Sequence, residues 1–194
     1  MSSTYFENLT YDNLVFSTET FSTAEYEQCR FVQCDLTSAD LSACRFVDCV
    51  FEGCNLSNAK LSQTSFRDVQ FIHCKMLGLM FDACQAFGVS FSFEDCILDH
   101  CSFYGTAIKN TVFKHCRLQE ADFTNADLSG AGFERCDLLG ANFDNTILEK
   151  ADFSTAINFV IDPMKNKVKK ARFGLDGLPG LLSRFDIVIK DRPD

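Results

Sequence analysis

Residues 113–133 read FKHCRLQEADFTNADLSGAGF. In this stretch a large apolar residue recurs at every fifth position, and the residue two places before it is small. A period of five fits neither the 3.6-residue period of a helix nor the two-residue period of a strand. It fits a chain that turns a corner every five residues, so that four sides close one square coil. The large residue, called the centre below, and the small residue then point inward.

Two rails of identical side chains run through the repeat at a longer spacing. One rail is cysteine and the other phenylalanine, and in each the spacing is 20 residues with one step of 22. The rails are Cys34, Cys54, Cys74, Cys96, Cys116 and Cys136, and Phe31, Phe51, Phe71, Phe91, Phe113, Phe133 and Phe153. Two rails with the same 20-residue spacing predict a solenoid whose coils stack in register, with both rails in its core.

The repeat resembles that of the pentapeptide-repeat family, which reads roughly Ala-Asp-Leu-x-x or Ala-Asn-Phe-x-x. Unaltered copies begin at Ala39, Ala121, Ala126, Ala141 and Ala151, and the match covers about residues 20–157. The resemblance implies an all-β fold, a right-handed quadrilateral β-helix, and the handedness comes from the resemblance alone. Stacked coils at the ordinary strand spacing of about 4.8 Å would give roughly 6–7 coils and a rod on the order of 30 Å long.

The composition points to one domain in the cytoplasm. Residues 1–10 lack the basic and apolar regions of a signal peptide, and no apolar run approaches the length of a membrane span. All 11 cysteines occupy the small inward position, which favours buried, reduced thiols over a disulfide stack or a metal site.

Charge is unevenly distributed along the chain. Residues 1–160 carry 22 acidic and 10 basic side chains, whereas residues 161–194 carry 5 acidic and 8 basic ones. An acidic rod disfavours nucleic acid or an anionic membrane as a direct partner and suits a basic groove on a protein. The alternative is that Asp and Asn before each centre favour the corner turn and keep the solenoid soluble. Candidate partner-binding acids are Asp35, Asp40, Asp48, Glu52, Asp68, Asp122, Asp127, Asp137, Asp144 and Asp152.

The repeat domain is predicted over residues 1–157, with an irregular N-terminal cap over 1–15 and a first coil that starts near residue 11. The frame breaks once, where two extra residues enter within 86–95. They form either a bulge absorbed by the coil or a small projecting loop that contacts a partner. The candidate loop residues are Phe87, Phe93, Glu94 and Asp95.

Residues 158–194 lose the repeat and are predicted to cap the last coil and to dimerise. Asp176–Phe185 is expected to be a short helix with Asp176 as its N-cap and Pro179 in its first turn. Lys167–Phe173 and Asp186–Lys190 are expected to be short strands. The candidate residues for a homodimer through this tail are Leu178, Leu181, Leu182, Phe185 and Ile187, and the resemblance also implies such a dimer.

The sequence offers no catalytic, cofactor-binding or metal-binding residues, so an enzyme is not expected. It contains no phosphate-binding loop, no Gly-x-Ser-x-Gly, no Cys-x-x-Cys and no His-Glu-x-x-His. His73, His100 and His115 each lie two residues after a centre, on different sides or coils, and are expected to be separate surface groups.

Two functions remain open. Within the family, Cys74–Gly78, Ser92–Leu98 and Ile161–Phe173 resemble the quinolone-resistance and topoisomerase-poison immunity branch. That resemblance implies a dimeric DNA mimic that binds DNA gyrase or topoisomerase IV, although several members project longer loops than two extra residues allow. The alternative is a generic interaction scaffold with an unidentified cytoplasmic partner. A continuous acidic face would favour the first, and a patchwork of charges the second.

Overall fold

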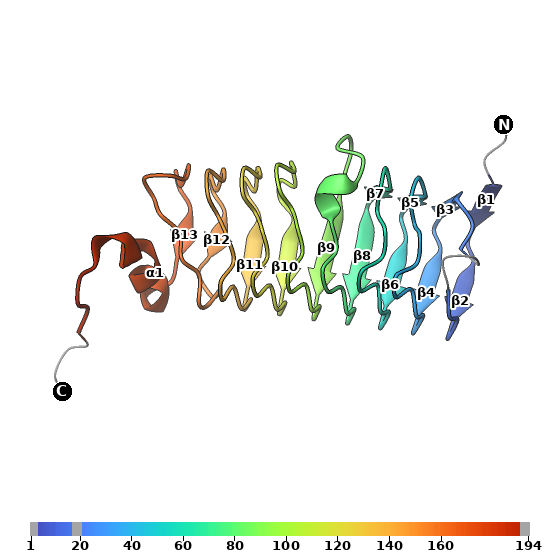
Figure 1. Ribbon diagram of the computed structural model, residues 1–194, viewed down its shortest axis with the longest axis horizontal. Coiled ribbons are helices and arrows are strands. Elements are labelled where there is room, and N and C mark those ends of the chain that lie inside the picture. The colour runs from blue at the N-terminus through green and yellow to red at the C-terminus, as the bar shows by residue number, and fades with distance from the viewer. Residues whose placement is uncertain (1–3, 17–20, 191–194) are drawn as a thin grey trace.

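The chain folds into one elongated parallel β-solenoid whose two ends carry the two termini (Figure 1). The computed structural model describes residues 4–16 and 21–190. All strand pairs in this part of the chain are parallel and in register 20 or 22 residues apart. The all-β solenoid with a short C-terminal helix, predicted from the sequence, is therefore confirmed.

Two sheets make up the strand-rich walls. The nine-stranded sheet contains, in spatial order, β2 (Thr10–Asp12), β4 (Arg30–Val32), β6 (Val50–Glu52), β8 (Val69–Ile72), β9 (Phe91–Glu94), β10 (Val112–Lys114), β11 (Gly132–Glu134), β12 (Asp152–Phe153) and β13 (Arg172–Phe173). The four-stranded sheet contains β1 (Thr4–Glu7), β3 (Ala24–Glu27), β5 (Arg45–Val47) and β7 (Ser65–Arg67). Single bridges between successive coils continue the ladder on the remaining walls.

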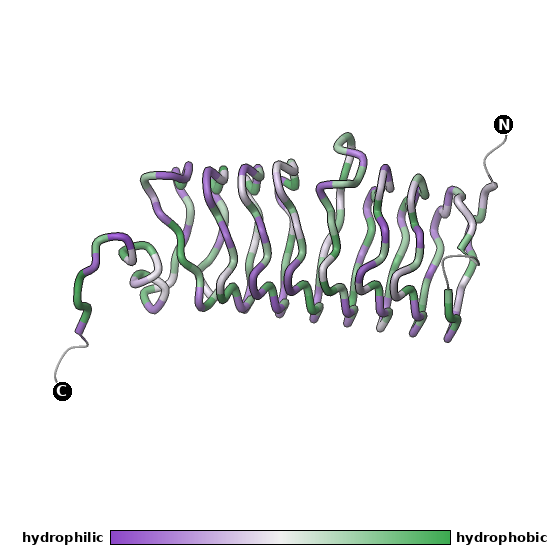
Figure 2. The backbone as a smooth tube through the Cα atoms, in the orientation of Figure 1, coloured by the Kyte–Doolittle hydropathy of each residue, from purple (hydrophilic) through white to green (hydrophobic). Residues whose placement is uncertain are grey.

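Each coil has four sides, named A to D here in chain order. Side A is the nine-stranded sheet, and sides B and C follow it along the chain. Side D is the four-stranded sheet together with the bridged residues Ala107, Asp127, Ile147 and Lys167. Apolar and polar residues alternate around every coil, as the hydropathy colouring in Figure 2 shows.

The core is a set of stacked side chains that run along the axis of the rod. On side A the rings of Phe31 and Phe51 stack with centroids 4.6 Å apart and planes 6° from parallel. The rings of Phe113 and Phe133 stack in the same way at 4.9 Å. Rings on opposite sides meet edge to face across the core, as Phe113 of side A and Phe123 of side C do at 6.1 Å and 82°. Such pairs add to the stabilisation that burial alone provides.

The cysteine rail is buried and hydrogen-bonded. The thiol of Cys54 donates to the carbonyl oxygen of Phe31 at 3.2 Å, and the thiol of Cys74 donates to that of Phe51 at 3.3 Å. All 11 cysteines are buried, free thiols. Burial raises the pKa of Cys49 to about 12, so this thiol stays protonated and unreactive at neutral pH.

Three details of the repeat differ from the prediction. The first coil begins at Thr4 and not near residue 11, because β1 and β2 pair with β3 and β4. The N-terminal segment is therefore regular over 4–15, and residues 1–3 of the predicted cap lie outside the described part. The ladder also continues beyond residue 157 to β13, so nine strands span about 38 Å at the ordinary strand spacing. The division at residue 157 stays a prediction.

The phenylalanine rail passes through Phe93, and its assignment to Phe91 is wrong. Phe93 pairs with Phe71 below it and with Phe113 above it. Phe91 stands opposite Val69, at the inward position that a small residue fills in other coils. The two extra residues therefore enter before Phe91, and the side-A centre of this coil is Phe93, two residues later than expected.

The C-terminal segment caps the last coil with helical turns. These are η2 (Leu175–Gly177), α1 (Leu178–Leu182) and η3 (Ser183–Phe185). Gly180 packs so closely on Phe159 that a Cβ would lie 2.0 Å from the Phe159 carbonyl oxygen. Arg184 fixes the cap to the last coil through two hydrogen bonds to the Asp162 carboxylate, at 2.9 and 2.8 Å.

The predicted N-cap and two predicted strands of the tail are wrong in detail. Gly177 precedes α1 without a side-chain cap, because Asp176 lies inside the preceding 3-10 turn. Only β13 and a bridge at Lys167 form within Lys167–Phe173. Asp186–Lys190 forms no strand or bridge in the described part of the chain: Asp186 has a left-handed backbone, with φ of 49°, and the segment runs away from the last coil (Figure 1). Residues 191–194 lie outside the described residues.

Replacing a stacked ring should destabilise the whole rod. We expect Phe113→Ala to lower the free energy of unfolding by about 3–5 kcal/mol, because Phe113 is 0 % exposed and stacks on a ring on either side. Phe87→Ala is the matched control, since this side chain is 85 % exposed, and should change stability by less than about 0.5 kcal/mol. Urea denaturation measures both. Equal losses would contradict the stacked core.

Candidate protein-binding surface

A loop on side D breaks the regular outline of the rod. It projects between β7 and β9 (Figure 1), after the short helix η1 (Phe81–Ala83). Gln85 still follows the ladder by donating to the Thr64 carbonyl, and Ser90 rejoins it by donating to the Phe66 carbonyl, at 2.9 and 3.0 Å. The excursion is therefore confined to residues 86–89. The projecting loop, defined as residues 86–89, is therefore not a bulge absorbed by the coil, and its contact with a partner stays a prediction.

The projecting loop presents an apolar side chain to solvent. Phe87 is 85 % exposed, whereas Phe91 and Phe93 are buried. The hydroxyl of Ser90 anchors the base of the loop, since it accepts a hydrogen bond from the Asp68 amide at 2.7 Å and donates to the Asp68 carboxylate at 2.9 Å. The Phe87 ring therefore does not pack in the core of the rod.

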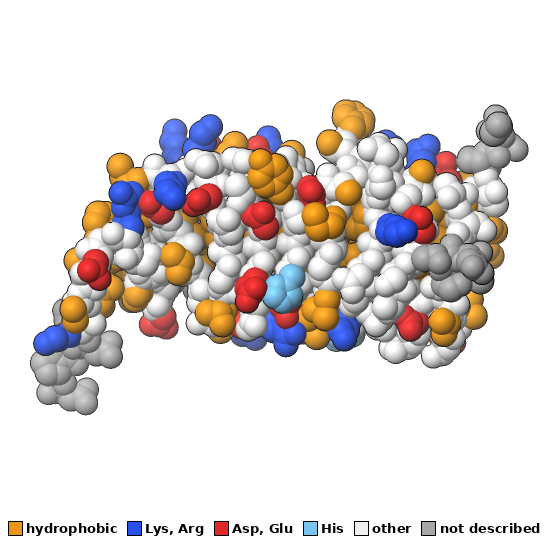
Figure 3. Space-filling view, in the orientation of Figure 1, with side chains coloured by type: hydrophobic (Ala, Val, Ile, Leu, Met, Phe, Trp, Pro, Cys, Tyr) orange, Lys and Arg blue, Asp and Glu red, His pale blue; other side chains and the backbone are white. Residues whose placement is uncertain are grey.

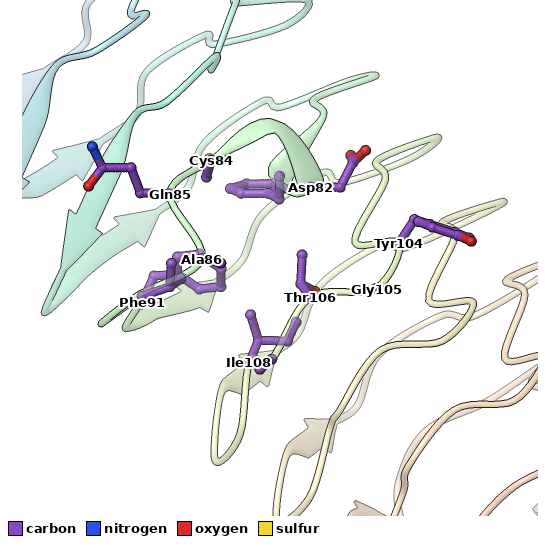
Figure 4. Close-up of a pocket in the computed structure, with 12 residues that line it drawn as sticks. Asp82, Cys84, Gln85, Ala86, Phe91, Tyr104, Gly105, Thr106 and Ile108 are labelled. Carbon is purple, nitrogen blue, oxygen red and sulfur yellow. The ribbon is translucent and has the colours of Figure 1, made fainter.

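A small cavity lies at the side of the loop (Figure 4). Its volume is about 70 Å³, and its lining includes Ala86, Val89, Phe91, Tyr104 and Ile108. In a regular coil a large apolar side chain, the centre of side D, would fill the space between Phe66 and Ile108. The loop puts no such side chain there, and the cavity forms in its place. It is too small for a substrate of drug size, which needs several hundred Å³.

The other loop candidates belong to the coil. Phe93 is a core ring of side A, so its assignment to the loop is wrong. Glu94 lies in β9, where Lys114 of the next coil donates to its carboxylate at 2.6 Å. Asp95 follows at the corner, with φ of 52°. Of the four candidates, only Phe87 lies on the projecting loop.

The ten candidate acids are distributed over all four sides. Glu52 and Asp152 lie on side A, Asp35 and Asp137 on side B, Asp40, Asp122 and Asp144 on side C, and Asp48, Asp68 and Asp127 on side D. On the face that Figure 3 shows, acidic and basic side chains are interspersed. The candidate acids therefore do not form one continuous acidic face.

Several of these acids stabilise the corners of the coil. The carboxylates of Asp35, Asp40 and Asp122 accept hydrogen bonds from the amides of Thr37, Ser42 and Thr124, at 2.9, 3.0 and 2.9 Å. Asn55 and Asn142 accept the same bond in other coils. The hydrogen bonds from Ser42 hold the pKa of Asp40 below its ordinary value. Asp40 is therefore anionic at neutral pH, and all three aspartates have a structural role at their corners.

Other acids are paired with bases of a neighbouring coil. The ion pairs are Arg30–Glu52 at 2.9 Å, Lys109–Asp127 at 3.1 Å, Lys165–Asp144 at 3.3 Å and Arg172–Asp152 at 2.9 Å. Exposed pairs of this kind contribute little to stability. They do reduce the negative potential on the sides where they lie.

Side A carries a cluster of two histidines and one aspartate that the sequence analysis did not predict. The Nδ1 atoms of His73 and His115 lie 3.7 and 3.4 Å from the two carboxylate oxygens of Asp95, which stands between them on the corner rail. The two histidines lie on different coils, as expected, but on the same side, and Asp95 of the intervening coil brings them into one cluster. Their spacing of 42 residues equals one step of 22 plus one of 20, so the rail spacing could have found it.

The tail exposes the apolar side chains that the sequence singled out. Leu178, Leu182, Phe185 and Ile187 are exposed, and Leu181 packs partly against the core. Between residues 4 and 16 and between 21 and 190, no group of three or more His, Cys, Asp or Glu side chains could hold a metal ion. In the same ranges no helix is long and apolar enough to cross a membrane.

Comparisons with known proteins identify the repeat. The model of the pentapeptide repeat region matches residues 24–92 and 87–153. A trypsin-treated form of QnrB1, a plasmid-mediated fluoroquinolone resistance protein, is similar in fold, with a TM-score of 0.50 at 18% identity over 97% of this chain and 98% of that chain. HetL, a pentapeptide repeat protein involved in heterocyst differentiation regulation from the cyanobacterium Nostoc sp. strain PCC 7120, gives a TM-score of 0.38 at 18% identity over 88% of this chain and 87% of its own. No curated protein matches the sequence.

The corner aspartates should make stability depend on pH. The pKa values of Asp35 and Asp40 are lowered in the folded chain, so their contribution is present above the unfolded value near 3.9 and is lost as the pH falls through the folded values. We expect D35N/D40N to lose less stability than the parent between about pH 5 and pH 2.5, because Asn keeps the bond and does not titrate.

D35A/D40A is the comparison variant. It removes both corner bonds and should cost about 0.5–1.5 kcal/mol per site at neutral pH. Urea midpoints at several pH values measure these effects. If D35N/D40N is as sensitive to acid as the parent chain, the corner carboxylates do not have the role assigned to them.

Proposed function

The chain belongs to the pentapeptide-repeat family, and we propose that it is a non-enzymatic protein-binding rod whose partner is a bacterial type II topoisomerase, DNA gyrase or topoisomerase IV. The observation that carries protein binding is the projecting loop, which holds Phe87 85 % exposed on an otherwise closed rod. The interior is filled by stacked side chains, so contacts with other molecules must be made on the surface.

Charge and shape support the choice of a topoisomerase. The chain carries a formal net charge of −9 on a straight rod. Such a rod suits the basic groove in which a type II topoisomerase holds DNA, so we propose DNA mimicry as the mode of binding. The corner aspartates contribute fixed anionic charge at the regular spacing of the coils. Binding in that groove would protect the enzyme from a quinolone or a toxin, in line with the fluoroquinolone resistance named for QnrB1.

Self-association through the C-terminal tail is part of this proposal. The exposed apolar side chains of the tail, including Phe185 of η3 and Ile187 at 55 % each, would be covered in a homodimer. Acidic composition argues against direct contact with nucleic acid or an anionic membrane, and the reduced cysteines suit the cytoplasm.

A second candidate function is a generic interaction scaffold with another cytoplasmic partner. The distribution of charge favours it, since the acids lie on all four sides and several are paired with bases of the next coil. A scaffold of this kind would bind through the projecting loop without needing a continuous acidic face. The two candidates therefore differ in whether binding depends on the acids or on Phe87.

A gyrase supercoiling assay at two salt concentrations tests the topoisomerase proposal. We expect purified protein to inhibit supercoiling or to protect gyrase from a fluoroquinolone, and we expect higher salt to weaken the effect because screening reduces electrostatic attraction. No effect up to tens of micromolar would contradict topoisomerase binding and would leave the scaffold.

Phe87→Ala tests the role of the loop. Removing the ring should weaken partner binding by at least about 1 kcal/mol while stability is unchanged, because the side chain makes few contacts within the rod. Leu139→Ala is the matched control, an apolar side chain on side B that is 55 % exposed. Isothermal titration calorimetry with gyrase measures the difference. Equal affinities for the two variants would show that the loop is not a contact.

A further inference from the structure

Side D lacks one of its core side chains. In the regular coils this side buries a large apolar residue, and these residues are Tyr26, Phe46, Phe66, Ile108, Leu128 and Leu148. Between Phe66 and Ile108, counting in fives from Phe81 reaches Ala86, which is small and exposed. The cavity of about 70 Å³ beside the projecting loop is the space of that missing side chain. The repeat itself therefore defines what fits there, which is one apolar side chain.

The cavity has an apolar floor and an exposed rim. Phe81, Phe91 and Ile108 are buried in its floor, and Ala86 is exposed at its rim. Figure 4 shows Ala86 and Phe91 on one side of the space and Thr106 and Ile108 on the other. An apolar cavity of about 150 Å³ takes benzene, so about half that volume suits a smaller, branched aliphatic group.

The backbone ladder is interrupted at the same place. In the next coil the amide of Asp127 donates to the carbonyl oxygen of Thr106 at 2.8 Å. The equivalent amide is that of Ala107, an exposed residue that lines the cavity. Within the described part of the chain this amide donates no hydrogen bond, because the loop carries the preceding coil away from it. The rim therefore offers a backbone donor beside the apolar space.

One carboxylate lies at the rim. Asp82 of η1 lines the cavity and is exposed. No base in residues 4–16 and 21–190 forms an ion pair with it, and Lys109 of the coil that follows is held by Asp127 at 3.1 Å. A base of a partner, placed next to the cavity, has Asp82 as its complementary charge.

We propose that this cavity receives one branched aliphatic side chain, that of Val, Leu or Ile, from a protein partner. A Lys or Arg beside that residue in the partner pairs with Asp82, and the Ala107 amide donates to a main-chain carbonyl of the same segment. Phe87 stays free to contact the partner next to the cavity. The inference rests on the proposed role of the projecting loop in protein binding, and it holds for a topoisomerase or for another partner.

Model peptides test the cavity with the full-length chain. We expect acetyl-Arg-Leu-Arg-amide to shift the methyl NMR signals of Val89 and Ile108, which line the cavity, in a saturable manner. Peptides with Ala or Phe in place of Leu should bind at least about fivefold more weakly, because Ala leaves the space empty and Phe exceeds it. Equal affinities for the Leu and Ala peptides, or no shifts up to about 10 mM peptide, would overturn the inference.

Two pairs of variants separate the cavity from the charge at its rim. C84M fills the space from its buried floor, since Met adapts to irregular gaps, and should abolish the shifts without lowering the urea midpoint. V112M adds the same side chain on the exposed surface of side A and should bind as the parent chain does. D82N should weaken binding at least about threefold and reduce its dependence on salt. E134Q, a change at an exposed acid of β11, should not. Undiminished binding by C84M or by D82N would contradict the proposal.

Gyrase distinguishes this inference from the proposed function. If gyrase binds the parent chain, C84M should weaken that binding at least about tenfold in isothermal titration calorimetry, whereas V112M should not. Binding of the Leu peptide without any binding of gyrase would support the cavity and would contradict the topoisomerase proposal. Binding of gyrase to C84M as tightly as to the parent chain would overturn the inference and leave the topoisomerase proposal standing.

Discussion

The hydrogen-bonded ladder between successive coils is the constraint on which the rest of the structure depends. Backbone hydrogen bonds pair each coil with the next in a register of 20 or 22 residues, so side chains stand directly above their equivalents in the previous coil. Because the register cannot slip, identical side chains gather into rails, and the core becomes a set of stacked rings and thiols. A polar side chain at an inward position needs a partner there, as Thr64 and Thr146 find in the carbonyl oxygens of Leu41 and Phe123. The ladder therefore explains why the sequence repeats as strictly as it does.

The same constraint determines what the acidic side chains do. A corner is needed every five residues, and an Asp or Asn before the centre closes it by accepting an amide hydrogen bond two residues later. Stacking would place such carboxylates one above another if every coil had one. In some coils a base takes the equivalent position instead, since Lys60 stands opposite Asp40 and Arg117 stands opposite Asp137. Negative charge is thus largely a consequence of the fold. Its use in binding depends on where the bases fall.

Much of the fold could be predicted from the sequence because it follows from spacing alone. The buried rails of Phe113 and Cys116, the square coil and the position of the frame break all come from counting in fives. Counting cannot tell whether the two extra residues enter before or after Phe91. In the first case Phe93 is the centre of side A, and in the second case Phe91 is, so either choice puts a phenylalanine on the rail. The projection of Phe87 depends on Ser90 and Asp68, whose side chains meet only in three dimensions. The tail has no repeat to count, so its cap on Phe159 could not be predicted.

The central functional claim is that the rod occupies the site on a type II topoisomerase where DNA binds. Competition measured by fluorescence anisotropy tests it most directly, with labelled duplex DNA bound to gyrase and the protein added in increasing amounts. The account predicts that the protein displaces the DNA and that the competition weakens as salt is raised. A ternary complex, in which gyrase holds both the protein and the DNA with undiminished affinity, would contradict it.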